Sequence, residues 1–174
     1  MTTRKHWLGF FLITILLGFV IIENLHSQTD NRLNGTWITG EDETGFELRF
    51  NNGNFERFLG GIPWDRGTYT INNNELIFTV THSFGEGLLN DLFDAFGVSR
   101  LESRWYSNDE FILAIVPIFI EMGFSENVIN DLLSSMNSAI NQSFIYSLDA
   151  DMLILTSTDE NMPLMFIYKR NNYL

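Results

Sequence analysis

Residues 46–58 read FELRFNNGNFERF and carry the clearest structural signal of the chain. Apolar and charged residues alternate over 46–50, which is the period-two pattern of a strand with one buried face, and Phe55-Glu56-Arg57-Phe58 follows after the turn. The intervening Asn51-Asn52-Gly53-Asn54 contains Asn-Gly, a strong signal for a tight hairpin turn. The stretch therefore predicts two antiparallel β-strands joined by a short turn.

The same pattern recurs on both sides of this hairpin. Short apolar-rich runs, most of them bounded by turns that contain Asn or Asp, lie at 37–39, 67–71, 76–80, 144–148, 152–156 and 164–170. Together with the central hairpin they give about eight strands, all consistent with antiparallel neighbours. Such spacing indicates a sandwich or an up-and-down barrel. We predict a mainly β fold, an antiparallel up-and-down β-barrel of about eight strands.

Residues 84–142 interrupt the strands with a helical pattern. Apolar residues recur at helical spacing over 88–96 and over 128–136, which predicts two amphipathic helices. Between them, Ser107-Asn108-Asp109-Glu110 has the spacing of a capping box and precedes the apolar run 111–120. We therefore predict an inserted subdomain of two to three helices.

The run 111–120 has no polar face, so a helix formed there needs cover on several sides. One interpretation is a central core helix sandwiched between the barrel and the two flanking helices. The other is a lid over an apolar cavity, or a surface that meets lipid. Pro117 kinks the helix or ends it in either case.

The N-terminal residues 1–27 have the pattern of a secretory signal. Arg4 and Lys5 precede an apolar run at 7–22, and polar residues follow at 23–27. At 16 residues the run lies between a signal core and a membrane-spanning helix, so the segment is either cleaved or kept as an anchor. We expect an exported protein, periplasmic or extracellular, in which 28–174 form a single domain.

Composition limits the partners of this domain. Residues 28–174 carry 8 basic and 21 acidic side chains, a net charge of −13, and the chain contains no cysteine. Such a charge repels phosphate backbones and anionic lipid surfaces. We expect no nucleic-acid partner, contact with a membrane only through an uncleaved 7–22 segment, and a ligand that is neutral, apolar or cationic.

The sequence carries no recognisable catalytic or metal-binding motif. His82 is the only histidine after residue 27, so one chain can build neither a histidine-dependent triad nor a multi-histidine metal site. The acidic triplet 41–43 matches no calcium loop, and no serine lies in Gly-x-Ser-x-Gly. We expect a protein that is not an enzyme and that holds no metal and no cofactor.

Three short segments resemble small exported bacterial lipocalin-like proteins, which are calycin-type β-barrels. They are GTW at 35–37, RGTY at 66–69 and YKR at 168–170. In lipocalins the Gly-x-Trp opens the barrel, and a basic side chain from near the chain end covers the indole, a contact that cation–π attraction favours. The resemblance implies a structural plug made by Gly35, Trp37 and either Lys169 or Arg170. It implies binding of small apolar molecules and does not extend over 83–142.

Two functions are compatible with these features. The leading hypothesis is a carrier or sensor of a small apolar ligand, because the strands at 76–80, 152–155 and 164–168 are apolar on both faces. Trp64 is expected on a loop, at a cavity mouth or as a packed anchor. The predicted ligand-binding residues are Trp64, Tyr69, Phe78, Ile115, Phe119 and Tyr146.

The alternative hypothesis is a protein-interaction or structural module of the cell envelope. An eight-stranded barrel is just wide enough for side chains to fill it. In this case the helical insertion recognises a protein, and the barrel is filled by its own aromatic residues, among them Phe46, Phe50, Tyr69, Phe78 and Phe144.

Overall fold

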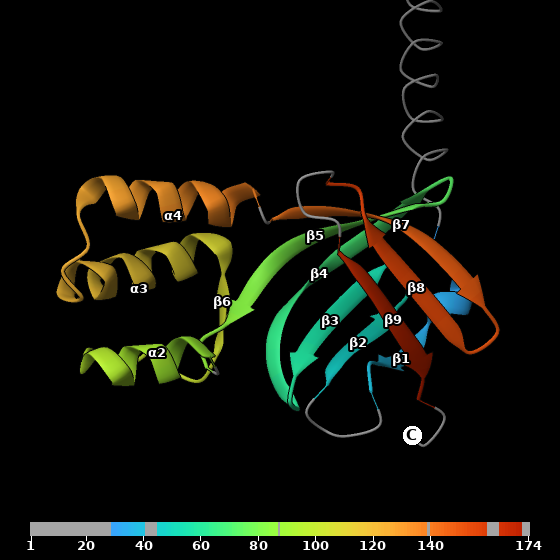
Figure 1. Ribbon diagram of the computed structural model, residues 1–174, viewed down its shortest axis with the longest axis horizontal. Coiled ribbons are helices and arrows are strands. Elements are labelled where there is room, and N and C mark those ends of the chain that lie inside the picture. Colours follow the sequence, from blue (N-terminus) through green and yellow to red (C-terminus); the bar gives the residue numbers. More distant parts are fainter. Residues whose placement is uncertain (1–28, 41–44, 87, 139, 160–163, 172–174) are drawn as a thin grey trace, which may run out of the picture.

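The computed structural model describes residues 29–40, 45–86, 88–138, 140–159 and 164–171 (Figure 1). The export segment predicted at 1–27 and the acidic triplet 41–43 lie outside these residues. Over the described ranges, none of the helices combines the length and the apolar character that crossing a bilayer would need.

Eight antiparallel strands form a closed ring, which confirms the predicted barrel (Figure 1). Each strand pairs with its neighbour in the order β1-β2-β3-β4-β5-β7-β8-β9, and β9 pairs with β1 to close the ring. A further strand, β6 (Trp105–Ser107), pairs with the end of β5 outside the ring. The strands of the ring are β1 (Gly35–Ile38), β2 (Phe46–Asn51), β3 (Asn54–Leu59), β4 (Ile62–Asn72), β5 (Glu75–Phe84), β7 (Asn141–Asp149), β8 (Met152–Ser157) and β9 (Met165–Arg170).

The tight turns have the chemistry that the sequence predicts. Asn52 and Gly53 join β2 to β3 with φ of 48° and 84°, so both adopt the left-handed conformation of a type I′ hairpin. Asn73 (φ 59°) serves the turn between β4 and β5. Ala150 (φ 46°), in the turn between β7 and β8, is the exception, because the left-handed conformation is sterically less favourable for alanine than for asparagine or glycine.

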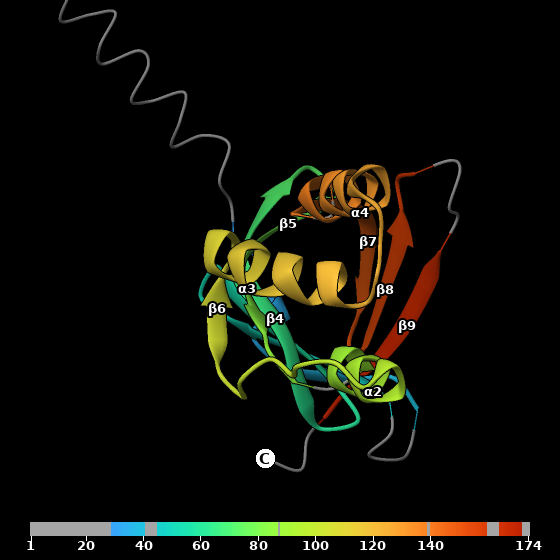
Figure 2. The ribbon, with the colours of Figure 1, turned by 90° about the vertical axis from the view of Figure 1, so that its left-hand side faces the viewer.

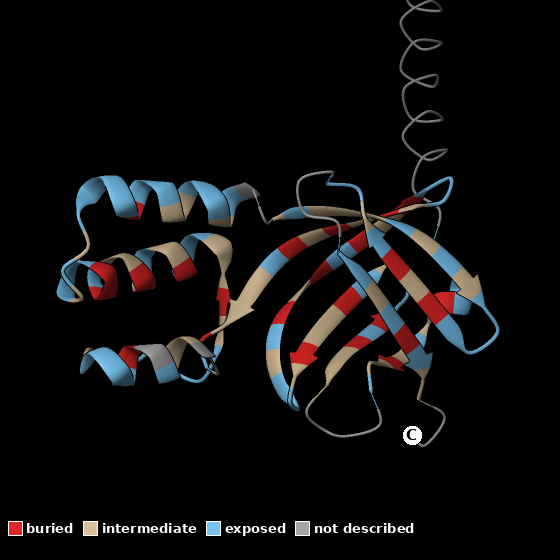
Figure 3. Cartoon of the chain, in the orientation of Figure 1, coloured by how far each residue is buried: buried red, intermediate tan, exposed pale blue. Residues whose placement is uncertain are grey.

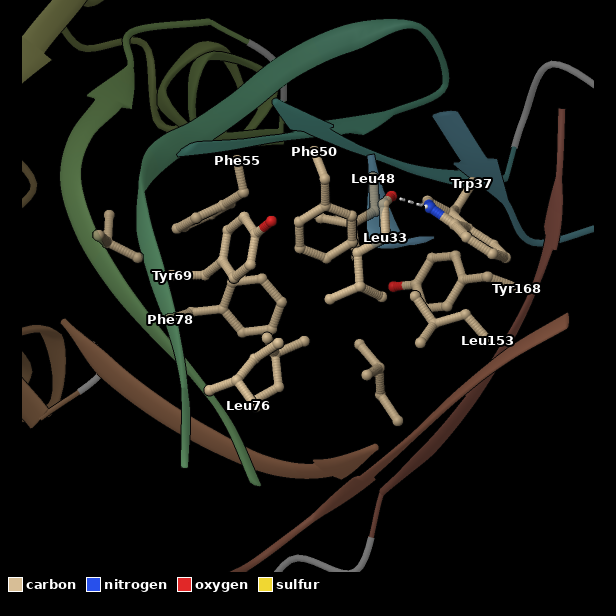
Figure 4. Close-up of a cluster of buried hydrophobic side chains, with 13 residues drawn as sticks. Leu33, Trp37, Leu48, Phe50, Phe55, Tyr69, Leu76, Phe78, Leu153 and Tyr168 are labelled. Atoms are coloured by element: carbon tan, nitrogen blue, oxygen red, sulfur yellow. Dashed lines mark hydrogen bonds between the residues drawn. The ribbon is translucent and has the colours of Figure 1, made fainter. Parts of the chain in front are cut away.

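Side chains of the ring itself fill the barrel interior (Figure 4). Figure 3 shows buried positions alternating with more exposed ones along the strands, as period-two burial requires. Aromatic rings meet at the centre, with centroids 4.8 Å apart for Phe50 and Tyr69 and 4.7 Å apart for Phe55 and Phe78. The buried residues of this barrel core are Leu33, Trp37, Leu48, Phe50, Phe55, Tyr69, Ile71, Leu76, Phe78, Val80, Leu153, Leu155 and Tyr168.

The predicted insertion contains three helices, α2 (Leu88–Phe96), α3 (Asn108–Glu121) and α4 (Glu126–Ser138). They stand beyond one end of the ring, where β5 continues out of the barrel to pair with β6 (Figures 1 and 2). The predicted capping box is present: the Glu110 carboxylate accepts a hydrogen bond of 2.9 Å from the Ser107 N–H, and the Ser107 hydroxyl accepts one from the Glu110 N–H. Pro117 lies inside α3 without ending it.

The helices build a second hydrophobic core, separate from that of the barrel. The interpretation that α3 is sandwiched between the barrel and two helices is therefore half right. It lies between α2 and α4 (Figure 1), but its buried side chains contact the helical core and not the barrel core. The reason is that β5 leads the chain away from the ring, so the helices bury their apolar faces on one another. This helical core consists of Phe93, Leu101, Tyr106, Phe111, Ile115, Ile118, Phe119 and Ile129.

Candidate functional site

A structural plug closes the end of the barrel opposite the helices. Trp37 is fully buried, and its indole N–H donates to the Leu33 carbonyl at 2.6 Å. The Arg170 guanidinium lies 4.5 Å from the centroid of the indole and donates to the carbonyls of Arg32 and Asn34. These contacts tie the end of the chain to the short 3₁₀ turn η1 (Asn31–Leu33) that precedes β1.

Register explains which basic residue covers Trp37. Trp37 pairs directly with Arg170 across β1 and β9, so both side chains point to the same face. Lys169 is the residue before Arg170 on β9, so its side chain points to the opposite face of the strand and is exposed. A side chain at Gly35 would come within 3.7 Å of the Arg170 guanidinium, and its φ of 121° disfavours any residue except glycine.

At the helical end, a row of aromatic rings leads from the surface into the barrel core. Trp64 is 47% exposed and stacks on Phe46, with the centroids 6.0 Å apart. Phe46 and Phe144 each lie 6.2 Å from Phe166, and Phe144 lies 5.8 Å from the buried Phe78. The expectation of a loop at Trp64 is wrong, because this residue belongs to β4, which begins at Ile62.

A polar cluster lies inside the otherwise apolar barrel, just below this aromatic row. The Arg57 guanidinium donates to both carboxylate oxygens of Asp65, at 2.6 Å for Nε, and to the Gln142 side-chain oxygen at 2.7 Å. The same guanidinium lies 5.5 Å from the Phe55 ring and 5.8 Å from the Phe78 ring. Asp65 is 6% exposed, so the ion pair is shielded from water and breaking it is costly.

Sequence reasoning missed this cluster because it did not follow the alternation past Phe55. Arg57, two residues further on, pairs with the inward-facing Leu48 and so lies on the inner face of β3. The pairing of β3 with β4 shifts register only after this point, between Arg57 and Phe58, and Arg57 pairs with Asp65 on β4. Nearby, burial raises the pKa of the Tyr168 hydroxyl to about 12, with the Asp65 carboxylate adding to the rise and Arg57 opposing it. The neutral phenol is therefore the form that the barrel stabilises.

The structure does not bring the six predicted ligand-binding residues together. Tyr69 and Phe78 are 2% and 1% exposed in the barrel core, while Trp64 lies at the helical end. Tyr146 is half-buried toward the plug end, where its N–H donates to the Asn74 carbonyl. Ile115 and Phe119 belong to the helical core instead. These residues therefore divide between two separate cores.

The buried tyrosines are held in their neutral forms. Burial raises the pKa of Tyr69, whose hydroxyl has no hydrogen-bond partner within the described part of the chain. Burial also raises the pKa of Tyr146, and the nearby Asp30 carboxylate raises it further.

Two clefts lie outside the barrel interior. A groove of about 470 Å³ runs along the outer face of β2 to β5, and its lining includes Arg49, Arg66 and His82. A second cleft of about 360 Å³ lies in the insertion, between α3 and the segment 99–104. Its apolar lining consists of Leu101, Tyr106, Ala114, Pro117 and Ile118.

Next to this second cleft, α3 exposes part of its apolar surface. Leu113 is 75% exposed and Ile120 is 61% exposed, with the exposed Pro117 between them. Asp109 and Glu121, both exposed, lie at the two ends of this face. Sequence reasoning could not locate it, because an apolar run without polar positions gives no sign of which side meets solvent.

The insertion is strongly acidic. Residues 84–142 contain nine carboxylates and two arginines. Arg100 is paired with Asp94, and Arg104 lies 3.3 Å from Glu102 and 3.7 Å from Glu110. The two arginines therefore leave seven carboxylates in excess around the apolar face of α3.

Comparison with family models, with curated proteins and with solved structures gave no match. Nor do the described residues contain a group of three or more histidine, aspartate or glutamate side chains placed to hold a metal ion. The coordinates define a closed eight-stranded antiparallel barrel, consistent with a calycin-like fold and compatible with a binding protein.

Proposed function

We propose that this protein is a non-catalytic binding protein that recognises another protein through its helical insertion, with the barrel as a scaffold. The observation that carries the proposal is the apolar face of α3, where Leu113 and Ile120 are 75% and 61% exposed beside a cleft of about 360 Å³. Contiguous exposed apolar side chains with a polar rim are typical of interaction sites.

The barrel supports this role because its interior is occupied. Thirteen buried side chains form its core, and the rings of Phe50, Tyr69 and Phe78 contact one another there. A filled barrel is a rigid body, since close-packed interiors resist deformation. β5 belongs to the ring and also pairs with β6, so a continuous strand connects the scaffold to the insertion.

Site-specific photo-crosslinking in the producing cells tests the proposal. A photoreactive residue at Leu113 or Ile120 should give a discrete crosslinked product. The matched positions are Met165 and Ile167, which are 63% and 47% exposed on the outer face of β9. Products from the β9 positions alone, or from neither pair, would contradict recognition through the insertion.

A second candidate function is binding of a small apolar ligand at the helical end of the barrel. The row from Trp64 through Phe46 and Phe166 favours it, because these rings are only partly buried and lead into the core. A ligand at a hundredfold excess over its Kd would stabilise the fold by about 2.7 kcal/mol. A panel of fatty-acid-like molecules that shifts neither the melting temperature nor the Trp64 fluorescence would remove this candidate.

Export remains part of the proposal on sequence grounds. The basic residues Arg4 and Lys5, the apolar run 7–22 and the polar exit 23–27 support passage out of the cytoplasm, with cleavage after Ser27. The intact mass of the protein recovered from the producing cells tests this. A mass that starts at Gln28 is expected, and the full mass would show that residues 7–22 are kept as an anchor.

A further inference from the structure

The exposed face of α3 has the spacing that a partner helix would recognise. Leu113, Pro117 and Ile120 follow one another at i, i+4 and i+7 and are exposed, while Val116 at i+3 is partly buried and packs against the helical core. The Cα atoms of the three exposed residues, which form one stripe along the helix, span about 10 Å of helix length, or two turns. An amphipathic helix that docks in a groove presents apolar anchors at this same spacing.

The cleft next to the stripe offers a place for an anchoring side chain. Pro117 belongs to both, since it is exposed on α3 and also lines the cleft with Leu101 and Tyr106. A volume of about 360 Å³ exceeds that of any single side chain. The rest of the cleft lining is polar, formed by Ser99, Arg100, Glu102 and Arg104. The stripe and the apolar side of the cleft together form the docking surface.

The net charge of the insertion indicates which kind of partner can bind to the docking surface. Residues 84–142, which carry the docking surface, contain nine carboxylates and two arginines, both of which are paired with carboxylates. A second copy of the insertion would bring an equal negative charge, and an anionic lipid surface would be repelled as well. A cationic partner is attracted, and basic side chains at the two ends of its apolar stripe would meet Asp109 and Glu121.

We infer that the helical insertion binds a cationic amphipathic helix of another protein, whose apolar face lies on Leu113, Pro117 and Ile120 and whose basic residues meet Asp109 and Glu121. This inference rests on the proposed function and adds the chemistry of the partner. In this inference the acidic residues of the insertion contribute to recognition of the partner.

Synthetic peptides of about 18 residues, long enough for the stripe, serve as probes. One has leucine at i, i+3, i+4 and i+7 with lysine elsewhere. The second keeps the leucine stripe and replaces lysine by glutamate, and the third has the composition of the first in an order that forms no stripe. Binding to the purified protein is measured by fluorescence anisotropy at salt concentrations from about 0.05 M to about 0.5 M.

The striped lysine peptide should bind at least tenfold more tightly than either control peptide. L113Q/I120Q should weaken its binding at least tenfold, whereas M165T/I167T on β9 should leave it unchanged, because both pairs remove two exposed apolar side chains. D109N/E121Q should reduce the dependence of binding on salt. Far-ultraviolet circular dichroism of every variant checks that the fold is retained.

Four results would overturn the inference. Equal binding of the striped and unstriped lysine peptides would show attraction by net charge alone. Binding of the glutamate peptide as tight as that of the lysine peptide, still lost in L113Q/I120Q, would keep the docking surface but remove the cationic partner. Dimerisation of the protein that L113Q/I120Q abolishes would assign the surface to a second copy. Absence of binding by all three peptides, together with no crosslinks from Leu113, would remove the proposed function itself.

Discussion

The barrel and the helical insertion differ in how completely they cover their apolar residues. In the barrel, the inward side chains of the core are at most 7% exposed. In α3, Phe111, Ile115, Ile118 and Phe119 are buried, while Leu113 and Ile120 on the same helix face solvent. The barrel also exposes apolar side chains on its outer face, among them Met165 at 63% and Ile167 at 47%. The insertion differs because its most exposed apolar residues, Leu113 and Ile120, lie on one side of a single helix next to a cleft. Our proposal places binding on this side of the insertion.

The largest expected effect concerns the barrel plug. Trp37→Ala removes a fully buried indole and its hydrogen bond to Leu33, which should lower the free energy of unfolding by about 3–5 kcal/mol. The matched change Trp64→Ala, at a 47% exposed residue, should cost less than about 1 kcal/mol. Urea denaturation followed by circular dichroism measures both. Equal losses at the two tryptophans would break the contrast between the closed and the helical ends.

The next largest effect tests whether the barrel core and the helical core unfold independently. Ile115→Ala creates a cavity in the helical core and should destabilise the insertion by about 2–4 kcal/mol. Hydrogen–deuterium exchange should become faster in α2, α3 and α4, while the amides of β1 to β4 keep their protection, because local units open independently. Leu113→Ala on the exposed face is the control and should change neither. Faster exchange throughout the barrel would show that the two cores form one cooperative unit.

A third effect comes from pH and acts on the barrel. Burial raises the pKa of Tyr168 from 10.0 to about 12, so the folded protein holds this proton more tightly than the unfolded chain does. The stabilisation is complete below pH 10 and is lost as the pH rises toward 12, amounting to about 2–3 kcal/mol. Tyr168→Phe should flatten the fall in melting temperature over this range. An unchanged slope in that variant would show that other groups govern alkaline unfolding.

The smallest expected effect on stability is that of a change on the exposed side of α3, and it gives the clearest contrast with the buried cores. L113Q/I120Q changes only exposed side chains and should shift the free energy of unfolding by no more than about 0.5 kcal/mol. The same variant should abolish binding of the striped lysine peptide. Thermal denaturation and anisotropy on the same sample provide the two measurements. A large loss of stability would mean that the stripe is structural and is covered in the folded protein.

The local chemistry of the sequence predicts most of the barrel. The alternation over 46–50, the Asn-Gly turn and the pairing of Trp37 with a basic residue near the chain end all depend on residues that act locally or by strict register. Period-two burial leaves few choices once the strands are in order. The capping box at Ser107 likewise marks the start of α3.

The rest depends on contacts between strands that the local pattern does not show. Arg57 lies on the inner face of β3, two residues after the buried Phe55, and meets Asp65, a residue from the next strand. Pro63 and the glycines before it suggest a loop at Trp64, yet β4 accommodates the proline beside the register shift between β3 and β4. The ligand-binding set combined residues of two cores, because sequence does not show that β5 leads the insertion away from the ring.

Hydrogen–deuterium exchange with and without the striped lysine peptide tests the central claim most directly, since it reports on both regions in one experiment. We predict slower exchange in α3 and in the neighbouring segment 98–104, no change in the barrel strands, and loss of the effect in L113Q/I120Q. Protection of β2, β4 and β9 around Phe46, Trp64 and Phe166, with α3 unchanged, would contradict the account and place recognition at the end of the barrel.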